Sequence, residues 1–266
     1  MEELTITSLQ NAKVKRLVAL QQKSSERRKA KLFVVEGRRE IQHCVRSGYE
    51  LAEIFVCESL APSFASDFSC PVRPVTPAVY EKIAYRGSTE GVLATVHERL
   101  LTLGALRLSQ HPLLMVLERV EKPGNLGAVL RSADAAGADA VIVCDPLTDL
   151  YNPNLIRASI GSVFSVPTVT CSSEDCIRFL KQNNIQILTA QLQDSNLYYD
   201  TDMQRATAIV MGTEATGLTD VWRQAADAHI RIPMLGQMDS LNVSVSAAIL
   251  LFEAVRQRTQ GEALKE

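Results

Sequence analysis

The chain has 266 residues, of which 46% are apolar, 22% charged and 5% aromatic, with a formal net charge of −2. This balance excludes a chain that is disordered over most of its length, and its size allows one large domain or two smaller ones. The longest apolar runs, such as Ala247–Phe252, are too short to span a membrane, and the amino terminus has no secretory-signal pattern. The six cysteines are scattered without a C-x-x-C pair, which predicts reduced thiols in a cytoplasmic protein.

The first part of the chain predicts a small α/β domain over residues 1–97. A helix opens it, because Val14, Leu17, Val18 and Leu20 recur at helical spacing. The other elements follow from periodicity, capping residues and β-branched runs. We expect strands over 31–35, 53–57, 72–74 and 91–96, and helices over 36–46 and 76–84. Residues 98–112 are expected to be a linker.

From residue 113 to residue 266 strands and helices alternate more strongly. The expected strands are 113–117, 140–144, 166–169, 185–190, 208–211 and 228–232, and the expected helices are 124–136, 154–159, 173–182, 219–225 and 242–260. This alternation predicts an α/β domain with a parallel sheet covered by helices on both faces. Such sheets bind ligands beyond the carboxyl ends of their strands. The loops after residues 117, 211 and 232 are therefore where we expect chemistry.

Positive charge is concentrated near the amino terminus. Between Asn11 and Arg39 the chain carries a net charge of +8, which leaves −10 for the remainder. The basic residues here are Lys13, Lys15, Arg16, Lys23, Arg27, Arg28, Lys29, Lys31, Arg38 and Arg39. Clustered Lys and Arg are typical of a surface that binds phosphates, although a solvated helical face has the same composition.

Several common enzyme motifs are absent from the sequence. No G-x-G-x-x-G follows a predicted strand, and there is no P-loop, H-E-x-x-H or G-x-S-x-G. The four histidines are far apart, and Cys171 and Cys176 read as small core residues, so we expect no metal site. The missing glycine fingerprint also argues against a nicotinamide-dependent oxidoreductase.

The first loop of interest precedes the helix expected over 124–136. Asn125 stands at a capping position, and Arg131 follows six residues later, close to two helical turns. A surface arginine on a buried helix would give the same pattern. However, Gly127 and Ala128 allow a ligand to approach the start of this helix closely.

The second loop begins where the apolar strand 208–211 runs into Gly212. Backbone amides become accessible there, and Glu214 lies in the turn. A plain connection between a strand and a helix remains an alternative for this loop.

The third loop leads into the last helix. It is unusually apolar, with Ile232, Met234 and Met238, and it ends in the helix-capping residues Ser240 and Asn242. Capping alone would explain the two polar residues, but exposed apolar loops commonly line a binding site.

Together these loops resemble a known family. The strings N-x-G-A-x-x-R at Asn125–Arg131, G-T-E-x-x-G-L at Gly212–Leu218 and I-x-I-P-M…S-L-N-V-S-V at Ile230–Val245 resemble, in order, the three motifs of SpoU/TrmH-type RNA 2′-O-ribose methyltransferases. The likeness runs from about residue 113 to the end. The first part of the chain is similar only in layout to the small RNA-binding domain of many members.

The resemblance implies a methyltransferase domain with a trefoil knot that binds S-adenosylmethionine and forms a homodimer through its last helix. The cofactor would be held by Gly212, Ile232, Leu241, Met234 and Gln191. The residues implied in catalysis are Arg131, Asn125, Glu214, Ser240 and Asn242. A guanidinium keeps its proton in proteins, so we expect Arg131 to grip the target phosphate and polarise the ribose hydroxyl rather than act as a base.

An RNA substrate gives the basic stretch a function, because Lys13, Arg16, Arg27, Arg28, Lys29, Lys31, Arg38 and Arg39 would then dock RNA. Ribosomal RNA is favoured over transfer RNA, since an added amino-terminal RNA-binding domain resembles the ribosomal branch of the family. Two alternatives stay open at this stage: a transfer-RNA methyltransferase, and an RNA-binding or ribosome-assembly factor that has the fold without the activity.

Overall fold

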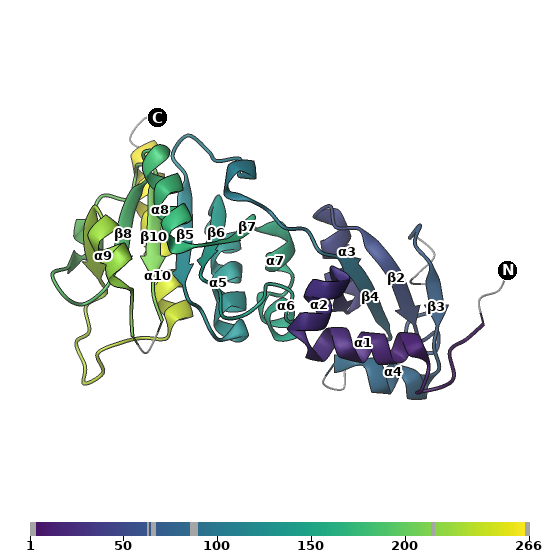
Figure 1. Cartoon of the computed structure of the whole chain (residues 1–266). Coiled ribbons are helices and arrows are strands. Elements are labelled where there is room, and N and C mark those ends of the chain that lie inside the picture. The colour runs from purple at the N-terminus through teal and green to yellow at the C-terminus, as the bar shows by residue number, and fades with distance from the viewer. Residues whose placement is uncertain (1–3, 63, 65–67, 86–89, 214–215, 264–266) are drawn as a thin grey trace. The chain divides into compact units, whose positions relative to one another are not determined.

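The computed structural model describes residues 4–62, 64, 68–85, 90–213 and 216–263 of a chain that forms two compact units (Figure 1). Unit 1 comprises the residues up to Arg99 together with Asp149–Ser165, and unit 2 comprises Leu100–Thr148 with the residues from Val166 onward. The boundaries expected from the sequence, 1–97 and 113–266 around a linker, leave Asp149–Ser165 in the second domain. Its membership of unit 1 is the main difference from that expectation.

Unit 1 is built on a four-stranded sheet whose strand order is β1-β4-β2-β3. The strands are β1 (Leu32–Glu36), β2 (Leu51–Val56), β3 (Val72–Pro74) and β4 (Val92–His97). The helices packed with it are α1 (Ala12–Gln22), α2 (Ser24–Ala30), α3 (Arg38–Arg46) and α4 (Pro77–Ile83). Leu17 of α1 and Ile83 of α4 share a buried core with Val34 and Phe55 of the strands. Alternate residues of a strand point to the same face of the sheet, and one of these faces carries the core.

The segment Asp149–Ser165 belongs to unit 1 through aromatic and polar contacts. It contains α6 (Pro153–Ser159) and α7 (Ser162–Ser165), of which α7 was not predicted. The Tyr151 ring stacks on Phe33 with 4.1 Å between ring centroids. The hydroxyl of Tyr85 donates to Asn154 Oδ1 at 2.7 Å. A segment distant in sequence therefore contributes directly to the core of unit 1.

Unit 2 contains a seven-stranded sheet in the order β7-β6-β5-β10-β8-β11-β9, with every neighbouring pair parallel. The strands are β5 (Leu113–Glu118), β6 (Ala140–Cys144), β7 (Thr168–Cys171), β8 (Gln186–Ala190), β9 (Asn196–Leu197), β10 (Thr207–Met211) and β11 (Ala228–Arg231). The chain leaves β5 toward β6 and β7 and later returns on the other side, so the strand order reverses between β5 and β10. Ligands bind at such a reversal. Strand β7 begins two residues later than expected, after Pro167, which has no N–H to donate.

Helices cover both faces of this sheet, as the alternation of elements predicts (Figure 1). On one face, α8 (Ser173–Gln182) and α9 (Asp220–Ala225) bury Leu180 and Trp222 against the strands. On the other, α5 (Pro123–Ala135) packs against α10 (Val243–Ala263). Two short 3-10 turns, Leu103–Ala105 and Tyr198–Asp200, complete the unit. In the described part of the chain, no helix has both the length and the apolar character needed to cross a membrane.

Arg258 fastens the far end of α10 to the amino ends of the strands. Its guanidinium donates to the backbone carbonyl oxygens of His111 at 2.7 Å, Pro112 at 3.3 Å, Met203 at 3.0 Å and Arg205 at 2.9 Å. Burial lowers the pKa of Arg258, but a guanidinium stays charged at neutral pH. The last helix is thus tied to the sheet by hydrogen bonds from a charged group as well as by its apolar face.

Candidate functional site

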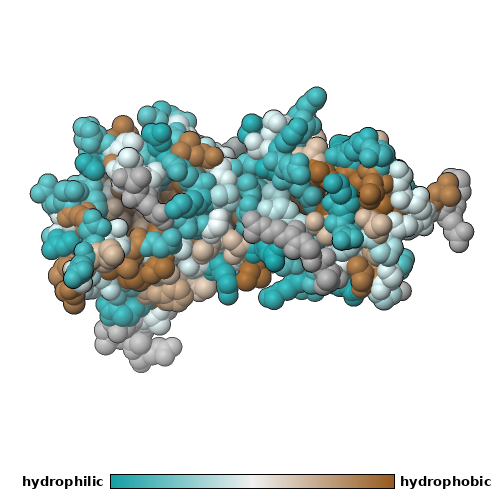
Figure 2. All heavy atoms as spheres, turned by 90° about the horizontal axis from the view of Figure 1, so that it is seen from below, coloured by the Kyte–Doolittle hydropathy of each residue, from teal (hydrophilic) through white to brown (hydrophobic). Residues whose placement is uncertain are grey.

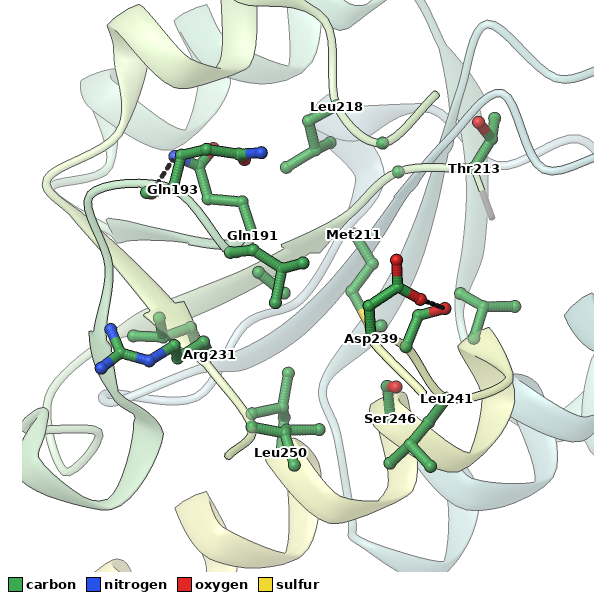
Figure 3. A pocket seen from close by; sticks show the side chains of 18 of the residues that line it. Gln191, Gln193, Met211, Thr213, Leu218, Arg231, Asp239, Leu241, Ser246 and Leu250 are labelled. Atoms are coloured by element: carbon green, nitrogen blue, oxygen red, sulfur yellow. Dashed lines mark hydrogen bonds between the residues drawn. The ribbon is translucent and has the colours of Figure 1, made fainter. Parts of the chain in front are cut away.

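A hollow of about 360 Å³ lies at the carboxyl ends of β8, β10 and β11, beside the loop 232–241 and the first turns of α10 (Figure 3). Apolar and polar side chains line it together, as is typical of a small-molecule site. The lining side chains labelled in Figure 3 are Gln191, Gln193, Met211, Thr213, Leu218, Arg231, Asp239, Leu241, Ser246 and Leu250. All five residues that the sequence resemblance assigned to the cofactor lie in this wall: Gly212, Ile232, Leu241, Met234 and Gln191.

Gly212 allows two parts of the chain to approach closely at the end of β10. A Cβ added there would lie 2.2 Å from the carbonyl carbon and oxygen of Gly217 and 2.5 Å from the amide nitrogen of Leu218. Because those neighbours are backbone atoms, they have no rotamer with which to move aside. Thr213 and Gly217 exchange two backbone hydrogen bonds, at 3.2 and 3.0 Å, which keeps the loop tight. Only glycine fits at position 212 without moving this wall of the hollow.

Glu118, at the end of β5, fixes the far side of the same loop. Its side chain is only 3% exposed and accepts hydrogen bonds from the amide of Thr219 at 2.8 Å and from the Thr219 hydroxyl at 2.6 Å. These contacts join β5 to the residue that precedes α9. Glu118 is a functional residue that was not predicted, although a carboxylate at the end of an apolar strand is a signal in the sequence.

Gln191 presents an unused acceptor beside the hollow. Its Nε2 donates to the backbone oxygen of Gln193 at 2.9 Å, whereas its Oε1 is buried and has no hydrogen-bond partner among the described residues. A buried acceptor without a donor costs about 1–3 kcal/mol, so a ligand donor or a water at this position is favoured. Gln191 is therefore suited to bind the polar part of a ligand held against an apolar wall.

A smaller hollow of about 110 Å³ lies between the first loop, the second loop and the start of α10. Asn125, Gly212, Thr213 and Val243 are among the residues lining it. Asn242 Nδ2 donates to Asn125 Oδ1 at 3.3 Å, while Asn242 Oδ1 caps α10 by accepting from the amide of Ser244. The expectation that Asn125 caps its own helix is wrong, because α5 begins at Pro123 after Lys122.

The placement of Arg131 beside the cofactor and the target ribose stays a prediction. Its side chain is exposed on α5, and neither of the two hollows described above is lined by it. A helix turns by about 100° per residue, so six residues turn by about 600°, which is about 120° short of two full turns. The side chains of Asn125 and Arg131 therefore leave the helix about 120° apart. Ser240, in contrast, lines the larger hollow and donates to Asp239 at 3.2 Å. Glu214 lies outside the residues that the structure describes.

The basic residues near the amino terminus fall into two groups. Arg27 must be removed from the predicted RNA surface, because it is only 5% exposed and forms a bidentate ion pair with Asp149, at 2.6 and 3.1 Å. Lys13 pairs with Glu53, and half-buried Arg38 donates to the carbonyl of Leu60 at 3.0 Å. The predicted RNA-binding residues that are exposed are Arg16, Arg28, Lys29, Lys31 and Arg39.

Comparison with known proteins identifies the family. Residues 112–252 match the model of the SpoU rRNA Methylase family, and residues 11–94 match the model of the MRM3-like substrate binding domain. The chain belongs to the SpoU rRNA methylase family. The family match covers every strand of the unit 2 sheet that contributes to the two hollows.

Several SpoU methylases are similar to this chain. It is 37% identical over 192 residues to the 23S rRNA (guanosine-2′-O-)-methyltransferase RlmB of Bordetella pertussis, covering 70% of this chain and 78% of that protein. It is 30% identical to the 23S rRNA (uridine(2479)-2′-O)-methyltransferase of Streptomyces viridochromogenes, over 96% of this chain and 93% of the relative. An AdoMet-bound rRNA methyltransferase from Sinorhizobium meliloti superimposes with a TM-score of 0.88 at 30% identity, over 96% of this chain and 98% of the other.

Proposed function

We propose that the protein transfers a methyl group from S-adenosylmethionine to a ribose 2′-hydroxyl of ribosomal RNA. The observation that carries this proposal is the larger hollow, which is formed by the second and third SpoU motifs at the carboxyl edge of the sheet. Relatives named as 23S rRNA 2′-O-methyltransferases support ribosomal over transfer RNA. One of them is named for guanosine and another for uridine, so the target base does not follow from the family.

The residues of the larger hollow fit S-adenosylmethionine. Met211, Leu218 and Leu250 offer an apolar wall for the adenosine, and the unused Gln191 Oε1 can accept from one of its donors. Arg231 and Asp239 offer opposite charges for the carboxylate and ammonium of the methionine part. When bound, this group supplies an activated methyl on a sulfonium, so the protein's contribution is position rather than strong base chemistry.

On the RNA side, we assign the target ribose to the region where Asn125 and Asn242 meet. Their amide groups are neutral hydrogen-bonding partners that can orient a hydroxyl, and Ser240 stands at the neighbouring wall. We keep Glu214 as a pocket residue because it belongs to the second motif, Gly212–Leu218. The proton of the hydroxyl leaves to phosphate or water.

Arg131 is assigned to the phosphate next to the target ribose. An exposed guanidinium outside both hollows is available to bind a phosphate of a long RNA in a bidentate manner. In unit 1, exposed Arg16, Arg28, Lys29, Lys31 and Arg39 would dock neighbouring phosphates. We place this activity in the cytoplasm.

We further propose a trefoil knot and a homodimer formed through α10. In support of the knot, α10 packs against β5 and α5, the first strand and the first α-helix of unit 2. A chain end that passes through the preceding loops to reach them forms a knot. For the dimer, Val245 and Phe252 are 47% and 48% exposed, and with Ile249 they form one stripe at helical spacing. Figure 2 shows hydrophobic residues, in brown, among hydrophilic ones on the surface of unit 2. Light scattering tests both parts of this proposal: we expect a dimer for the unchanged protein and a monomer for Phe252→Asp. A monomeric unchanged protein would contradict the dimer, and a variant that stays dimeric would contradict its formation through α10.

Calorimetric titration with S-adenosylmethionine and transfer of its labelled methyl to ribosomal RNA test the activity. We expect binding and transfer, followed by loss of most turnover in Arg131→Lys with unchanged cofactor binding, because lysine is only a point charge. Arg178→Lys, on an exposed helix face, is the control. Binding of RNA without methyl transfer would favour a non-catalytic assembly factor. Mapping 2′-O-methyl groups by primer extension in cells with and without the gene identifies the nucleotide.

A further inference from the structure

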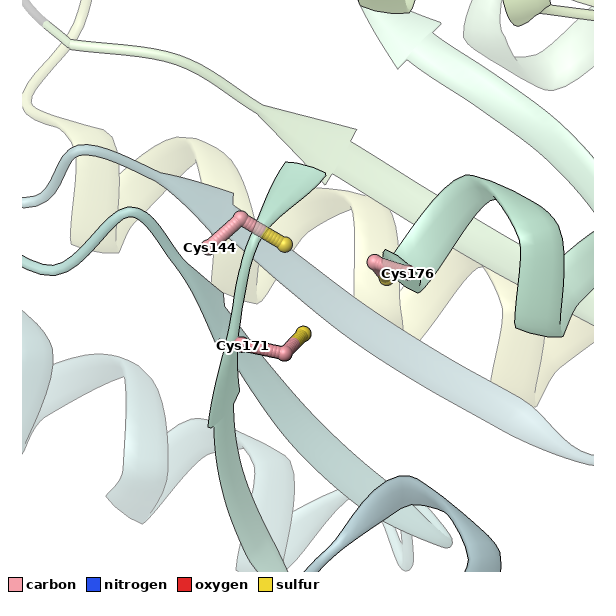
Figure 4. A group of neighbouring side chains, drawn as sticks. All are labelled: Cys144, Cys171 and Cys176. Atoms are coloured by element: carbon pink, nitrogen blue, oxygen red, sulfur yellow. The ribbon is translucent and has the colours of Figure 1, made fainter. Parts of the chain in front are cut away.

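Three cysteines from separate elements converge at the carboxyl edge of the unit 2 sheet (Figure 4). Cys144 is the last residue of β6, Cys171 is the last residue of β7, and Cys176 is the fourth residue of α8. Their sulfur atoms all lie within 4.8 Å of one another. None of the three lines either hollow, so the methyltransferase site does not account for the cluster.

The sulfur spacing is close to that of a metal site. A tetrahedral Zn²⁺ with Zn–S bonds of about 2.3 Å places its sulfurs about 3.8 Å apart, so a small contraction of this cluster would suffice. A disulfide would use two of the thiols and leave the third unpaired. Cys144 and Cys171 are register partners on adjacent parallel strands, which directs both side chains to the same face.

The elements that present the thiols are held rigidly. Asp145, directly after Cys144, accepts hydrogen bonds from the Ser173 hydroxyl at 2.6 Å and amide at 3.3 Å, and its own amide donates to the carbonyl of Cys171 at 2.9 Å. The indole of Trp222 donates to the Ser173 hydroxyl at 3.0 Å. This network joins the ends of β6 and β7 to the start of α8, as a site fixed before a cation binds requires.

The electrostatic environment favours a cation. Cys171 is the most exposed of the three positions, so a cation can reach the cluster from its side. The carboxylates of Asp145 and Asp175 also act on Cys171 and attract positive charge. Cys144 and Cys176 are fully buried, which leaves the Cys171 side open for a fourth ligand from solvent.

We propose that Cys144, Cys171 and Cys176 form a three-thiolate binding site for a thiophilic divalent cation of the Zn²⁺ class, separate from the methyltransferase site. Thiolates select such cations over Mg²⁺ and Ca²⁺. Binding would release the thiol protons and clamp β6, β7 and α8 together. The expectation of no metal site was based on the absence of a C-x-x-C pair, the wide separation of the histidines and the interpretation of Cys171 and Cys176 as core residues.

The test uses the full chain, reduced, stripped with a chelator and desalted. We expect Zn²⁺ to bind in a one-to-one ratio in competition with a chromophoric chelator, and to raise the melting temperature. Co²⁺ should show the sulfur-to-cobalt charge-transfer band of a thiolate site. Cys171→Ser, which replaces the half-buried thiol with a group of similar size, should weaken Zn²⁺ binding by at least about 100-fold and remove that band.

Cys70→Ser is the matched control, because Cys70 is a half-buried free cysteine of unit 1 outside the cluster. It should bind Zn²⁺ as the unchanged protein does, and binding of S-adenosylmethionine by both variants would show that each is folded. The proposal is overturned if the stripped protein binds no Zn²⁺, or if Cys171→Ser binds it as tightly as the control. Equal loss in both variants would also overturn it.

Discussion

The two units place their charged groups differently. In unit 1 a buried arginine, Arg27, bonds to Asp149, and Glu53 accepts from both Lys13 and Arg73, while other basic side chains face solvent. In unit 2 the walls of the hollows come together through glycine, amide and backbone contacts, of which the bond between Asn125 and Asn242 is one example. Charge in unit 1 therefore serves cohesion and, as proposed, RNA binding. In unit 2 the site depends on shape as well as on the charges of Glu118, Arg231 and Asp239.

This difference matches the two ligands proposed. A phosphate backbone is long and uniformly charged, so a set of exposed lysines and arginines can bind it without a shaped cavity. A small cofactor needs a fixed wall, because misplacement by about 1 Å costs about 100-fold in rate. Substitutions in the two units should accordingly change different measurements.

The largest effect is expected for Gly212→Ala. The added Cβ would meet backbone atoms of Gly217 and Leu218, so the wall of the larger hollow must move. We expect methyl transfer to fall by about 100-fold or more and cofactor binding to weaken in calorimetry. RNA binding by unit 1 should persist in a filter-binding assay. Gly236→Ala is the control, since nothing lies within 4 Å of a Cβ there. Equal activity of the two variants would mean that the site in unit 2 does not depend on the close approach at Gly212.

Arg27→Ala should be the most damaging change in unit 1. It leaves the half-buried Asp149 carboxylate without its guanidinium and frees the carbonyl of Leu20, at an expected cost of about 3–5 kcal/mol in the free energy of unfolding. Hydrogen exchange should show early opening of α2 and Asp149–Ser165, while binding of S-adenosylmethionine persists. Arg28→Ala removes the same charge from an exposed neighbour and should cost little. A similar cost for both would mean that the ion pair is not structural.

The double variant Arg28→Ala/Lys29→Ala tests whether exposed basic residues of unit 1 bind RNA. Both side chains are exposed, so stability should change little, while RNA affinity falls and the slope of log K against log salt decreases by up to about 2. Measurement of binding at several salt concentrations gives this slope. An exposed lysine of unit 2, changed in Lys181→Ala, should leave it unaltered. An unchanged slope in the double variant would remove these residues from the RNA surface.

The smallest effect is expected for Glu53→Gln. Burial raises the pKa of Glu53, but hydrogen bonds from Lys13 and Arg73 outweigh it and hold the pKa below its usual value of 4.5. The stabilisation from the ionised group is therefore present above pH 4.5 and lost as the pH falls through the lower, folded-state pKa.

At neutral pH, Glu53→Gln should lower the free energy of unfolding by about 1 kcal/mol, and the difference from the unchanged protein should vanish in acid. Urea unfolding at a series of pH values measures it. Glu50→Gln, at an exposed position of the same unit, is the control. A difference that persists in acid would mean that packing, not charge, connects Glu53 to its partners.

Most elements could be predicted because each is encoded locally. The apolar run Ala140–Cys144 and the acidic first turn of the helix Ser173–Gln182 coincide with the observed elements. Errors arose where the local signal was weak: α2 is a short charged helix, β9 has two residues, and α7 has four. The knot, the homodimer and the catalytic roles came from the family resemblance and stay predictions.

Long-range partners could not be predicted from local patterns. Nothing in the sequence around Tyr151 indicates that its ring stacks on Phe33, so the segment Asp149–Ser165 was assigned to the wrong side of the domain boundary. Likewise Arg27 is one basic residue among ten until Asp149 is placed beside it. For the larger hollow, the motifs located Gly212, Ile232 and Leu241, but Arg231 and Asp239 needed coordinates.

The position of α10 has a consequence for synthesis on the ribosome. Val243, Ser246 and Leu250 complete the larger hollow, and Arg258 ties the helix to strand ends made much earlier. A nascent chain therefore lacks part of the cover over one face of the unit 2 sheet until α10 has been synthesised. Removal of α10 would therefore yield a product prone to aggregation rather than a weakened enzyme.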